Sequence, residues 1–158
     1  RDQPRSRGLG DVYKRQVYND IPFKYEAGTP NIGGAVGLAA AIRYVSGLGL
    51  DNIAAHEQKL TDMAVEGLKA MPRLTVLAPD VPHSAVVSVL AEGIHHYDLG
   101  TLLDQMGIAV RTGHHCCQPL MCALGTTGTT RASFALYNTE EEVQTFLKSM
   151  NRALDMLS

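Results

Sequence analysis

Apolar residues recur along this chain with two different periods, and the change of period marks the predicted elements. Between Ile53 and Met71 the apolar positions repeat at near-helical spacing, which predicts an amphipathic helix. Asp51 is the expected N-cap of this helix, and Pro72 lies just beyond its end. Related patterns predict further helices over residues 33–46, 97–106 and 139–157.

Short runs of β-branched residues lie between the later helices and predict strands. They cover residues 74–77, 85–90, 108–110 and 130–136. Strands mixed with helices, with helices at both ends, favour an α+β fold: a small mixed sheet with helices packed on one face. Residues 22–32 are punctuated by proline, glycine and asparagine, so we expect a loop before the first helix.

The composition of the chain bears on its partners and on the setting in which it works. The 158 residues are 45% hydrophobic and 19% charged, with a net charge of −2. This balance gives no reason to expect nucleic acid or an anionic membrane as a partner, and no apolar run is long enough to span a bilayer. The three cysteines lie within seven positions, which is not a disulfide framework and favours a reducing, cytoplasmic setting.

The first sixteen residues differ from the rest of the chain. They carry five basic and two acidic residues and show no periodicity. We expect residues 1–16 to be a foreign or disordered leader, since a natural basic tail fits poorly with the abrupt change at Val17. Residues 17–50 then form a loop and interdomain helix segment, and residues 51–158 form the α+β domain.

The candidate chemistry is concentrated in one loop, Arg111-Thr-Gly-His-His-Cys116-Cys117, which ends at a proline. The thiolate is the reactive form of cysteine, and neighbouring cations stabilise it. Cys116 is therefore interpreted as a nucleophile rather than as a small buried hydrophobe. Cys117 has the same surroundings, so the spacing alone does not say which thiol reacts.

His114 and His115 allow two interpretations. Together with Cys116, Cys117 and Cys122 they offer enough donors for zinc. Adjacent cysteines fold poorly around one ion, however, so the spacing argues against a metal site. The histidines could instead position or protonate a reacting group, because their charge changes near neutral pH.

Two arginines border the same loop, and each guanidinium matches the two oxygens of a carboxylate. Arg131 stands in an apolar run, which favours a substrate carboxylate clamp over a surface salt bridge, whereas for Arg111 both interpretations stay open. Upstream, Gly28 and Thr29 precede a predicted helix, where free backbone N–H groups can hold phosphate. The same Gly-Thr-Pro sequence is also typical of an ordinary turn.

Together these segments resemble the C-terminal part of the SUF-system (group II) cysteine desulfurases. These enzymes are members of the class V aminotransferase family and depend on pyridoxal 5′-phosphate. The resemblance covers about residues 18–158, and the Arg-x-Gly-His-His-Cys loop is its most specific motif. The other matching stretches are residues 25–31, 48–53, 118–121 and 131–139. The resemblance implies the C-terminal domain of a fold-type I enzyme that uses this cofactor.

The resemblance also implies roles for single residues. Cys116 is expected to take sulfur from L-cysteine as a persulfide for iron–sulfur cluster assembly, leaving L-alanine. Arg131 is expected to hold the substrate α-carboxylate, with Arg111 near the same substrate. Thr29, which follows Gly28, is expected to reach the cofactor phosphate of the opposite subunit, so the resemblance implies a homodimer.

The implied partners are L-cysteine or L-selenocysteine and a sulfur-acceptor protein of the SUF system. Selenocysteine lyase activity is an alternative within the same family. A zinc-binding module formed by the His/Cys cluster is an alternative of a different class. A truncated reading frame without catalytic activity is a third interpretation of this chain.

The sequence departs from the family pattern at two points. Cys117 stands where the family usually has a small residue such as alanine, and a thiol here could compete for or receive the sulfur. The family's N-terminal part, which holds the Schiff-base lysine, has no counterpart, and Lys24, Lys59, Lys69 and Lys148 match no lysine motif. We therefore expect the chain alone to be inactive and its parent protein to be a desulfurase.

Overall fold

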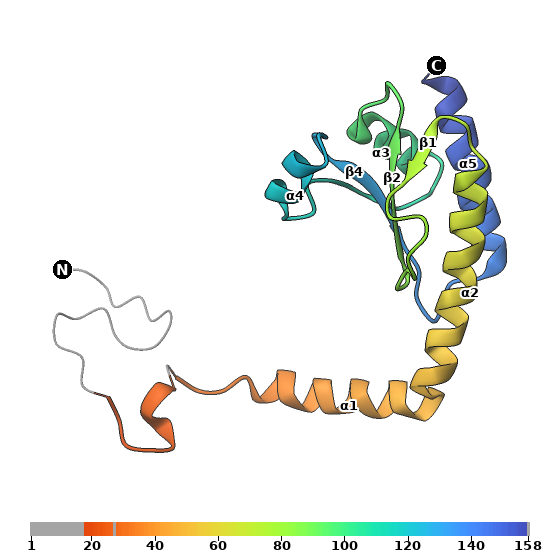
Figure 1. Ribbon diagram of the computed structural model, residues 1–158. Helices are drawn as coiled ribbons and strands as arrows, with labels where there is room; N and C mark the ends of the chain where they lie inside the picture. The colour runs from red at the N-terminus through yellow and green to blue at the C-terminus, as the bar shows by residue number, and fades with distance from the viewer. Residues whose placement is uncertain (1–17, 27, 158) are drawn as a thin grey trace. The chain divides into compact units, whose positions relative to one another are not determined.

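The computed structural model describes residues 18–26 and 28–157 (Figure 1). The leader expected over residues 1–16 lies outside the described residues. The described residues fall into two units, which are divided between Gly47 and Leu48.

In the first unit, a short 3-10 helix, η1 (Phe23–Tyr25), precedes the long helix α1 (Ile32–Leu48). Asn31 caps α1, because its Oδ1 accepts a hydrogen bond from the Gly34 backbone amide at 2.9 Å. No residue of α1 is buried. Its exposed large apolar side chains are Ile32, Val36, Leu38, Ile42, Tyr44 and Leu48. An apolar surface of this kind is typical of a face that makes contact with another segment or chain.

A four-stranded sheet in the order β1-β2-β4-β3 forms the base of the second unit (Figure 1). The strands are β1 (Leu74–Val76), β2 (Val86–Ala91), β3 (Arg111–Gly113) and β4 (Thr129–Ser133). Every neighbouring pair is antiparallel, which corrects the expected mixed sheet. The strands β2 and β3 are joined through a helix as in a parallel crossover. However, β4 inserts between them and runs antiparallel to both.

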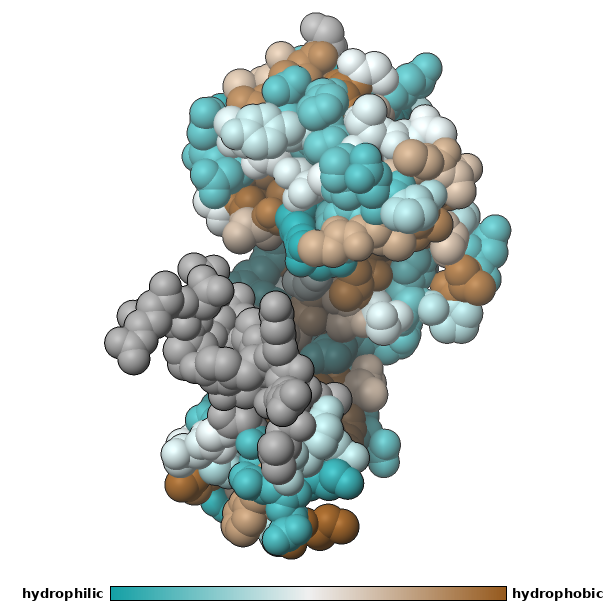
Figure 2. Space-filling view, turned by 90° about the vertical axis from the view of Figure 1, so that its left-hand side faces the viewer, coloured by the Kyte–Doolittle hydropathy of each residue, from teal (hydrophilic) through white to brown (hydrophobic). Residues whose placement is uncertain are grey.

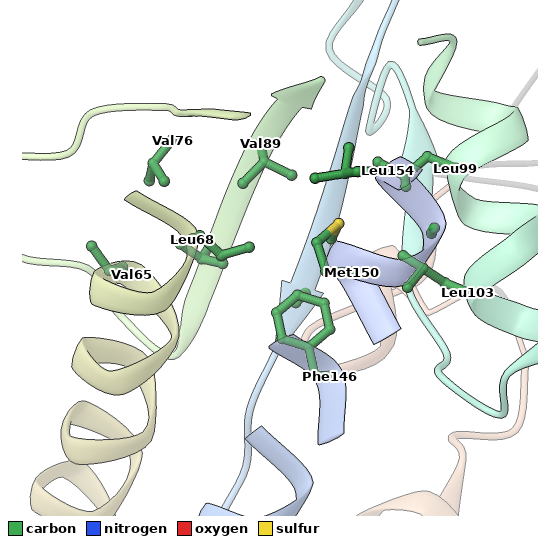
Figure 3. Packing of buried hydrophobic residues seen from close by; sticks show 12 residues of the cluster. Val65, Leu68, Val76, Val89, Leu99, Leu103, Phe146, Met150 and Leu154 are labelled. Atoms are coloured by element: carbon green, nitrogen blue, oxygen red, sulfur yellow. The ribbon is translucent and has the colours of Figure 1, made fainter. Parts of the chain in front are cut away.

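Three helices pack on one face of this sheet: α2 (Leu50–Lys69), α3 (His96–Gln105) and α5 (Glu140–Met156). Figure 3 shows their apolar side chains meeting those of the strands in one cluster. The members from the helices include Val65, Leu68, Leu99, Leu103, Phe146, Met150 and Leu154, and those from the strands include Val76, Val87, Val89 and Ala132. The α+β class with helices on one face is therefore confirmed.

Most predicted boundaries differ from the structure by a few residues, and two of these differences have a clear physical reason. Gly49, with φ of +87°, precedes α2, so Asp51 lies in the first turn and not at the N-cap. A carboxylate in the first turn still favours the positive end of the helix dipole. The strand expected over residues 108–110 begins three residues later, because Ile108 and Val110 pack against the core before pairing with β4 starts.

One helix has no counterpart in the prediction. α4 (Gln118–Ala123) follows the thiol loop directly and has six residues, too few for an apolar period to show. Pro119 lies in the first turn of α4, whereas the sequence predicts it at the end of a loop. Proline is tolerated there because its missing N–H would have no partner within the helix.

Among the described residues, no single helix is long and apolar enough to cross a membrane. Only α1 and α2 taken together, as a bent pair, meet the requirement of length and composition.

The side of the molecule that carries α4 faces the viewer in Figure 2, and polar and apolar side chains are mixed over its surface.

A capping box begins α5. The Thr139 hydroxyl accepts a hydrogen bond from the Glu142 amide at 3.2 Å, and the Glu142 carboxylate accepts one from the Thr139 amide at 3.0 Å. We expect Thr139→Ala to lower the free energy of unfolding by about 1 kcal/mol, measured by urea unfolding. Thr145→Ala is the control, because its hydroxyl bonds only the Glu141 carbonyl of the same helix. Equal losses for the two variants would contradict the capping role.

Candidate active site

The register of the sheet brings two arginines together. Arg111 of β3 lies directly opposite Arg131 of β4, and Ser88 of β2 lies opposite Arg131 on the other side. Residues paired in this way point to the same face of a sheet. Their chain neighbours Val87 and Ala132 point into the core beneath the helices, so the arginines lie on the face that α2, α3 and α5 leave open.

The thiol loop turns sharply between β3 and α4. The Cys117 amide donates to the His114 carbonyl at 2.9 Å and closes a four-residue turn. The two central residues, His115 and Cys116, have φ of +55° and +60°. Residues other than glycine adopt this conformation rarely, at a cost on the order of 1–3 kcal/mol each. Strain at the candidate nucleophile itself indicates a functional constraint on this turn.

Arg111 contacts the thiol of Cys116. Its Nη2 donates to Cys116 Sγ at 3.4 Å, and the thiol is exposed. A guanidinium stabilises a thiolate more than a thiol, because hydrogen bonds to an ionised acceptor are stronger. No carboxylate forms an ion pair with Arg111 among the residues that the structure describes. The structure therefore favours a role at the site for Arg111 over a surface salt bridge.

Arg131 is half-buried, and within the described ranges it too has no carboxylate partner. Its Nε is buried and meets no hydrogen-bond acceptor there. Like charges directly opposite one another in a sheet repel, and a buried donor without an acceptor is costly. A carboxylate on the open face would relieve both costs. Arg111 and Arg131 are therefore a candidate anion site beside the thiol loop.

His115 links the turn to β4. Its Nε2 lies 2.7 Å from the Thr129 hydroxyl oxygen, whereas its buried Nδ1 has no partner in the described part of the chain. Burial is the largest cause that lowers the pKa of His115 below its ordinary value, and the positive charge of Arg131 is the second. The ring is consequently neutral at pH 7, next in the chain to the candidate nucleophile, and it can take up or release a proton.

His96 is a site residue that the sequence pattern does not reveal. Its carbonyl accepts from the Thr130 hydroxyl at 3.4 Å, and its ring lies against that of His95 with centroids 4.2 Å apart. Burial is the largest cause that lowers the pKa of His96, and the electrostatic interaction with His95 is the second. The exposed His114 also lowers this pKa. The adjacent pair of histidines is visible in the sequence. The tertiary fold brings this pair near the thiol loop, since His114 and His115 both interact electrostatically with His96.

The two lowered histidine pKa values predict a pH-dependent stability. The unfolded chain takes up protons on His96 and His115 near pH 6.5, whereas the folded chain resists protonation until lower pH. We therefore expect the free energy of unfolding to fall as the pH drops from 7 through 6.5, and to level off below the lowered values. Urea unfolding at several pH values measures this slope, which His115→Gln should reduce. A flat profile from pH 7 to 5 would contradict the expectation.

The zinc interpretation gains no support from the geometry. Within residues 18–26 and 28–157, no three histidine, cysteine or acidic side chains are grouped to hold a metal ion. Instead the His115 ring meets the Thr129 hydroxyl, and the Cys116 thiol meets Arg111. The cluster is better described as a thiol site with an anion site beside it.

Residues 9–146 match the family described as Aminotransferase class-V. The chain belongs to this family. The family match covers both described units and includes the loop with Arg111, Cys116 and Arg131.

Curated relatives in this family carry the name cysteine desulfurase. The probable cysteine desulfurase of Vibrio cholerae is 44% identical over 141 residues, which are 89% of this chain and 35% of that protein. The cysteine desulfurase of Escherichia coli O127:H6 is 50% identical over 137 residues, which are 86% of this chain and 33% of that protein. The chain thus spans about a third of the length of the curated relatives it matches.

Solved structures of the same kind have the same fold. The cysteine desulfurase CsdA of Escherichia coli, in its S-sulfonic acid form, matches with a TM-score of 0.80 and 36% identity over 89% of this chain and 35% of that one. The apo cysteine desulfurase of Thermococcus onnurineus matches with a TM-score of 0.81 and 43% identity over 94% and 38%. The expected fold-type I architecture and the resemblance to cysteine desulfurases are confirmed.

Of the predicted site residues, the structure brings together Arg111, His115, Cys116 and Arg131 in the second unit of this class V family member. Gly28 and Thr29 are exposed in the first unit, in the loop before α1. Among the lysines that the structure describes, two form ion pairs with carboxylates: Lys59 with Glu140 and Lys69 with Asp80.

Proposed function

We propose that this chain is the C-terminal part of a pyridoxal 5′-phosphate-dependent cysteine desulfurase. The enzyme takes sulfur from L-cysteine, leaves L-alanine and carries the sulfur as a persulfide on Cys116. The observation that carries this proposal is the contact of Arg111 Nη2 with Cys116 Sγ at 3.4 Å, beside the unpaired Arg131. The relatives named cysteine desulfurase support it, because they match across both the thiol loop and β4.

The paired arginines bind the amino acid through its α-carboxylate. A guanidinium donates two parallel hydrogen bonds to a carboxylate, and the buried Nε of Arg131 meets no acceptor among the residues that the structure describes. Arg111, directly opposite, adds a second positive charge. This clamp fixes the α-carboxylate of the substrate and leaves its side-chain sulfur to be reached by the thiol loop.

Cys116 receives the sulfur. Its thiolate, stabilised by Arg111, approaches the sulfur of bound cysteine and forms the S–S bond as the carbon–sulfur bond breaks. Neutral His115, oriented through the Thr129 hydroxyl, can exchange a proton at Nδ1 during this step. Pyridoxal 5′-phosphate, when bound, supplies the electron sink that weakens the bonds at Cα and Cβ of the substrate.

The residues present fit one part of the cofactor, its phosphate. Thr29 offers an exposed hydroxyl, and Gly28 beside it lets a ligand come close to the backbone. We propose that Thr29 binds the phosphate of the cofactor held by the opposite subunit, so that the enzyme is a homodimer. We propose that the lysine that carries the cofactor lies in the part of the relatives that this chain does not span, since the chain covers about a third of their length.

We further propose a sulfur-acceptor protein of the SUF system as the partner and iron–sulfur cluster assembly in the cytoplasm as the purpose. The exposure of the Cys116 thiol supports transfer to another protein. L-Selenocysteine has the same α-carboxylate as L-cysteine and carries selenium in place of sulfur. A thiolate can attack selenium as it attacks sulfur, so the same site suits L-selenocysteine as a second substrate.

The test is a reaction of the full-length protein that contains this segment with L-cysteine and pyridoxal 5′-phosphate. We expect one L-alanine per sulfur transferred and an added sulfur on Cys116, measured by amino-acid analysis and mass spectrometry. The 158-residue chain under the same conditions is expected to form neither product. A full-length protein that yields no alanine would refute the proposed activity, whereas sulfide release by the short chain would refute only the expected inactivity.

A further inference from the structure

We propose that Cys117 is a second sulfur carrier, which takes the outer sulfur of the Cys116 persulfide within the same turn. This inference rests on the proposed function, because sulfur must first reach Cys116. Both thiols are exposed. The hydrogen bond from the Cys117 amide to the His114 carbonyl, at 2.9 Å, fixes the backbone that carries Cys117 next to the strained Cys116.

The spacing of the two residues favours transfer over a disulfide between them. Cα atoms of adjacent residues are about 3.8 Å apart, less than the roughly 4.4–6.8 Å that an unstrained disulfide spans. A direct bond between Cys116 and Cys117 is therefore disfavoured. An outer sulfur extends the Cys116 side chain by one S–S bond of about 2 Å, so transfer to Cys117 needs no bond between the two Sγ atoms.

The direction of transfer follows from the place of Arg111. Its Nη2 contacts Cys116 Sγ at 3.4 Å, whereas no described residue makes such a contact with Cys117 Sγ. Negative charge on Sγ is therefore stabilised on Cys116 and not on Cys117. When Cys116 carries an extra sulfur, the charge of the ionised form shifts to the outer atom, further from the guanidinium. The favoured state has the thiolate on Cys116 and the persulfide on Cys117.

In the transfer step, the Cys117 thiolate attacks the outer, protonated sulfur of the Cys116 persulfide. A new S–S bond forms to Cys117 Sγ. The bond between Cys116 Sγ and the outer sulfur breaks, and its electron pair stays on Cys116 as the thiolate beside Arg111. The outer sulfur keeps its proton, so no oxidant or reductant is consumed. Cys116 is then free to accept a second sulfur.

The experiment loads the 158-residue chain with sodium polysulfide, removes the excess, and traps persulfides with iodoacetamide after equilibration. Tandem mass spectrometry then separates position 116 from position 117. We expect roughly tenfold more extra sulfur on Cys117 than on Cys116, as the strength of a hydrogen bond to an ionised acceptor implies. Arg111→Gln should bring this ratio close to one.

Cys122→Ser is the matched control, because this exposed thiol lies on α4 outside the turn and its loss should leave the ratio unchanged. Equal or greater loading of Cys116 in the unaltered chain would overturn the proposal, as would a ratio that Arg111→Gln does not change. The sulfur comes from polysulfide rather than cysteine, so the ratio can be measured even if the full-length protein does not desulfurate cysteine. Conversely, loading confined to Cys116 would leave the proposed desulfurase activity intact.

Discussion

Replacing Cys116 with serine in the full-length protein is expected to abolish its persulfide and to slow alanine formation from L-cysteine by about a thousandfold or more. A serine hydroxyl is not ionised near neutral pH, and the Arg111 guanidinium that contacts Cys116 Sγ cannot activate it enough. Alanine yield per minute and the mass of the thiol-loop peptide measure the two effects.

The matched control for this substitution is Cys122→Ser, which removes an exposed thiol from the neighbouring helix α4 and should leave the rate unchanged. Cys117 remains in the Cys116→Ser variant, but it lacks the contact with Arg111. Full persulfide yield on Cys117 in that variant would show that Cys116 is not the residue at which sulfur enters.

Arg131→Gln is expected to lower kcat/KM for L-cysteine by about a hundredfold or more, mainly through a higher KM. The substitution removes the charge that meets the substrate carboxylate and leaves Arg111 to bind it alone. The register between β3 and β4 is made by backbone pairing, which this side-chain substitution leaves in place, so the sheet should survive.

Two further variants separate binding geometry from charge. Arg131→Lys keeps the charge but loses the planar fork, so most of the loss should remain. Arg152→Gln, in a pocket lined by residues of α3 and α5 that includes no residue of the thiol loop, removes a charge of the same sign and should have no effect. Equal losses in Arg152→Gln and Arg131→Gln would indicate a general effect of charge and contradict the carboxylate clamp.

Much of the second unit could be predicted from local pattern. The apolar spacing from Ile53 to Met71 depends on one helix face alone, and α2 occupies nearly the whole of that stretch. The capping box at Thr139 and Glu142 is likewise a local signal, and α5 begins at the residue after Thr139. Such signals need no knowledge of which strand lies beside which.

The geometry of the site could not be predicted in the same way. Arg111 and Arg131 are twenty positions apart, and they face one another only through the pairing of β3 with β4. The place of His96 beside the thiol loop is likewise set by tertiary packing, including the hydrogen bond from the Thr130 hydroxyl to the His96 carbonyl. The sequence identified the chemistry of the thiol loop, because the residue types lie next to one another, but strand order decided which neighbours it has.

The central place of β4 has a consequence for how this protein is made. β3 has β4 as its neighbour in the sheet and no other strand, although β4 comes later in the chain. During synthesis from the N-terminus, Arg111 and the thiol loop therefore emerge from the ribosome before the strand that holds Arg131. The two arginines come to face one another only after β4 has inserted between β2 and β3. We therefore expect that a nascent chain does not bind an anion beside the thiol loop until β4 is in place.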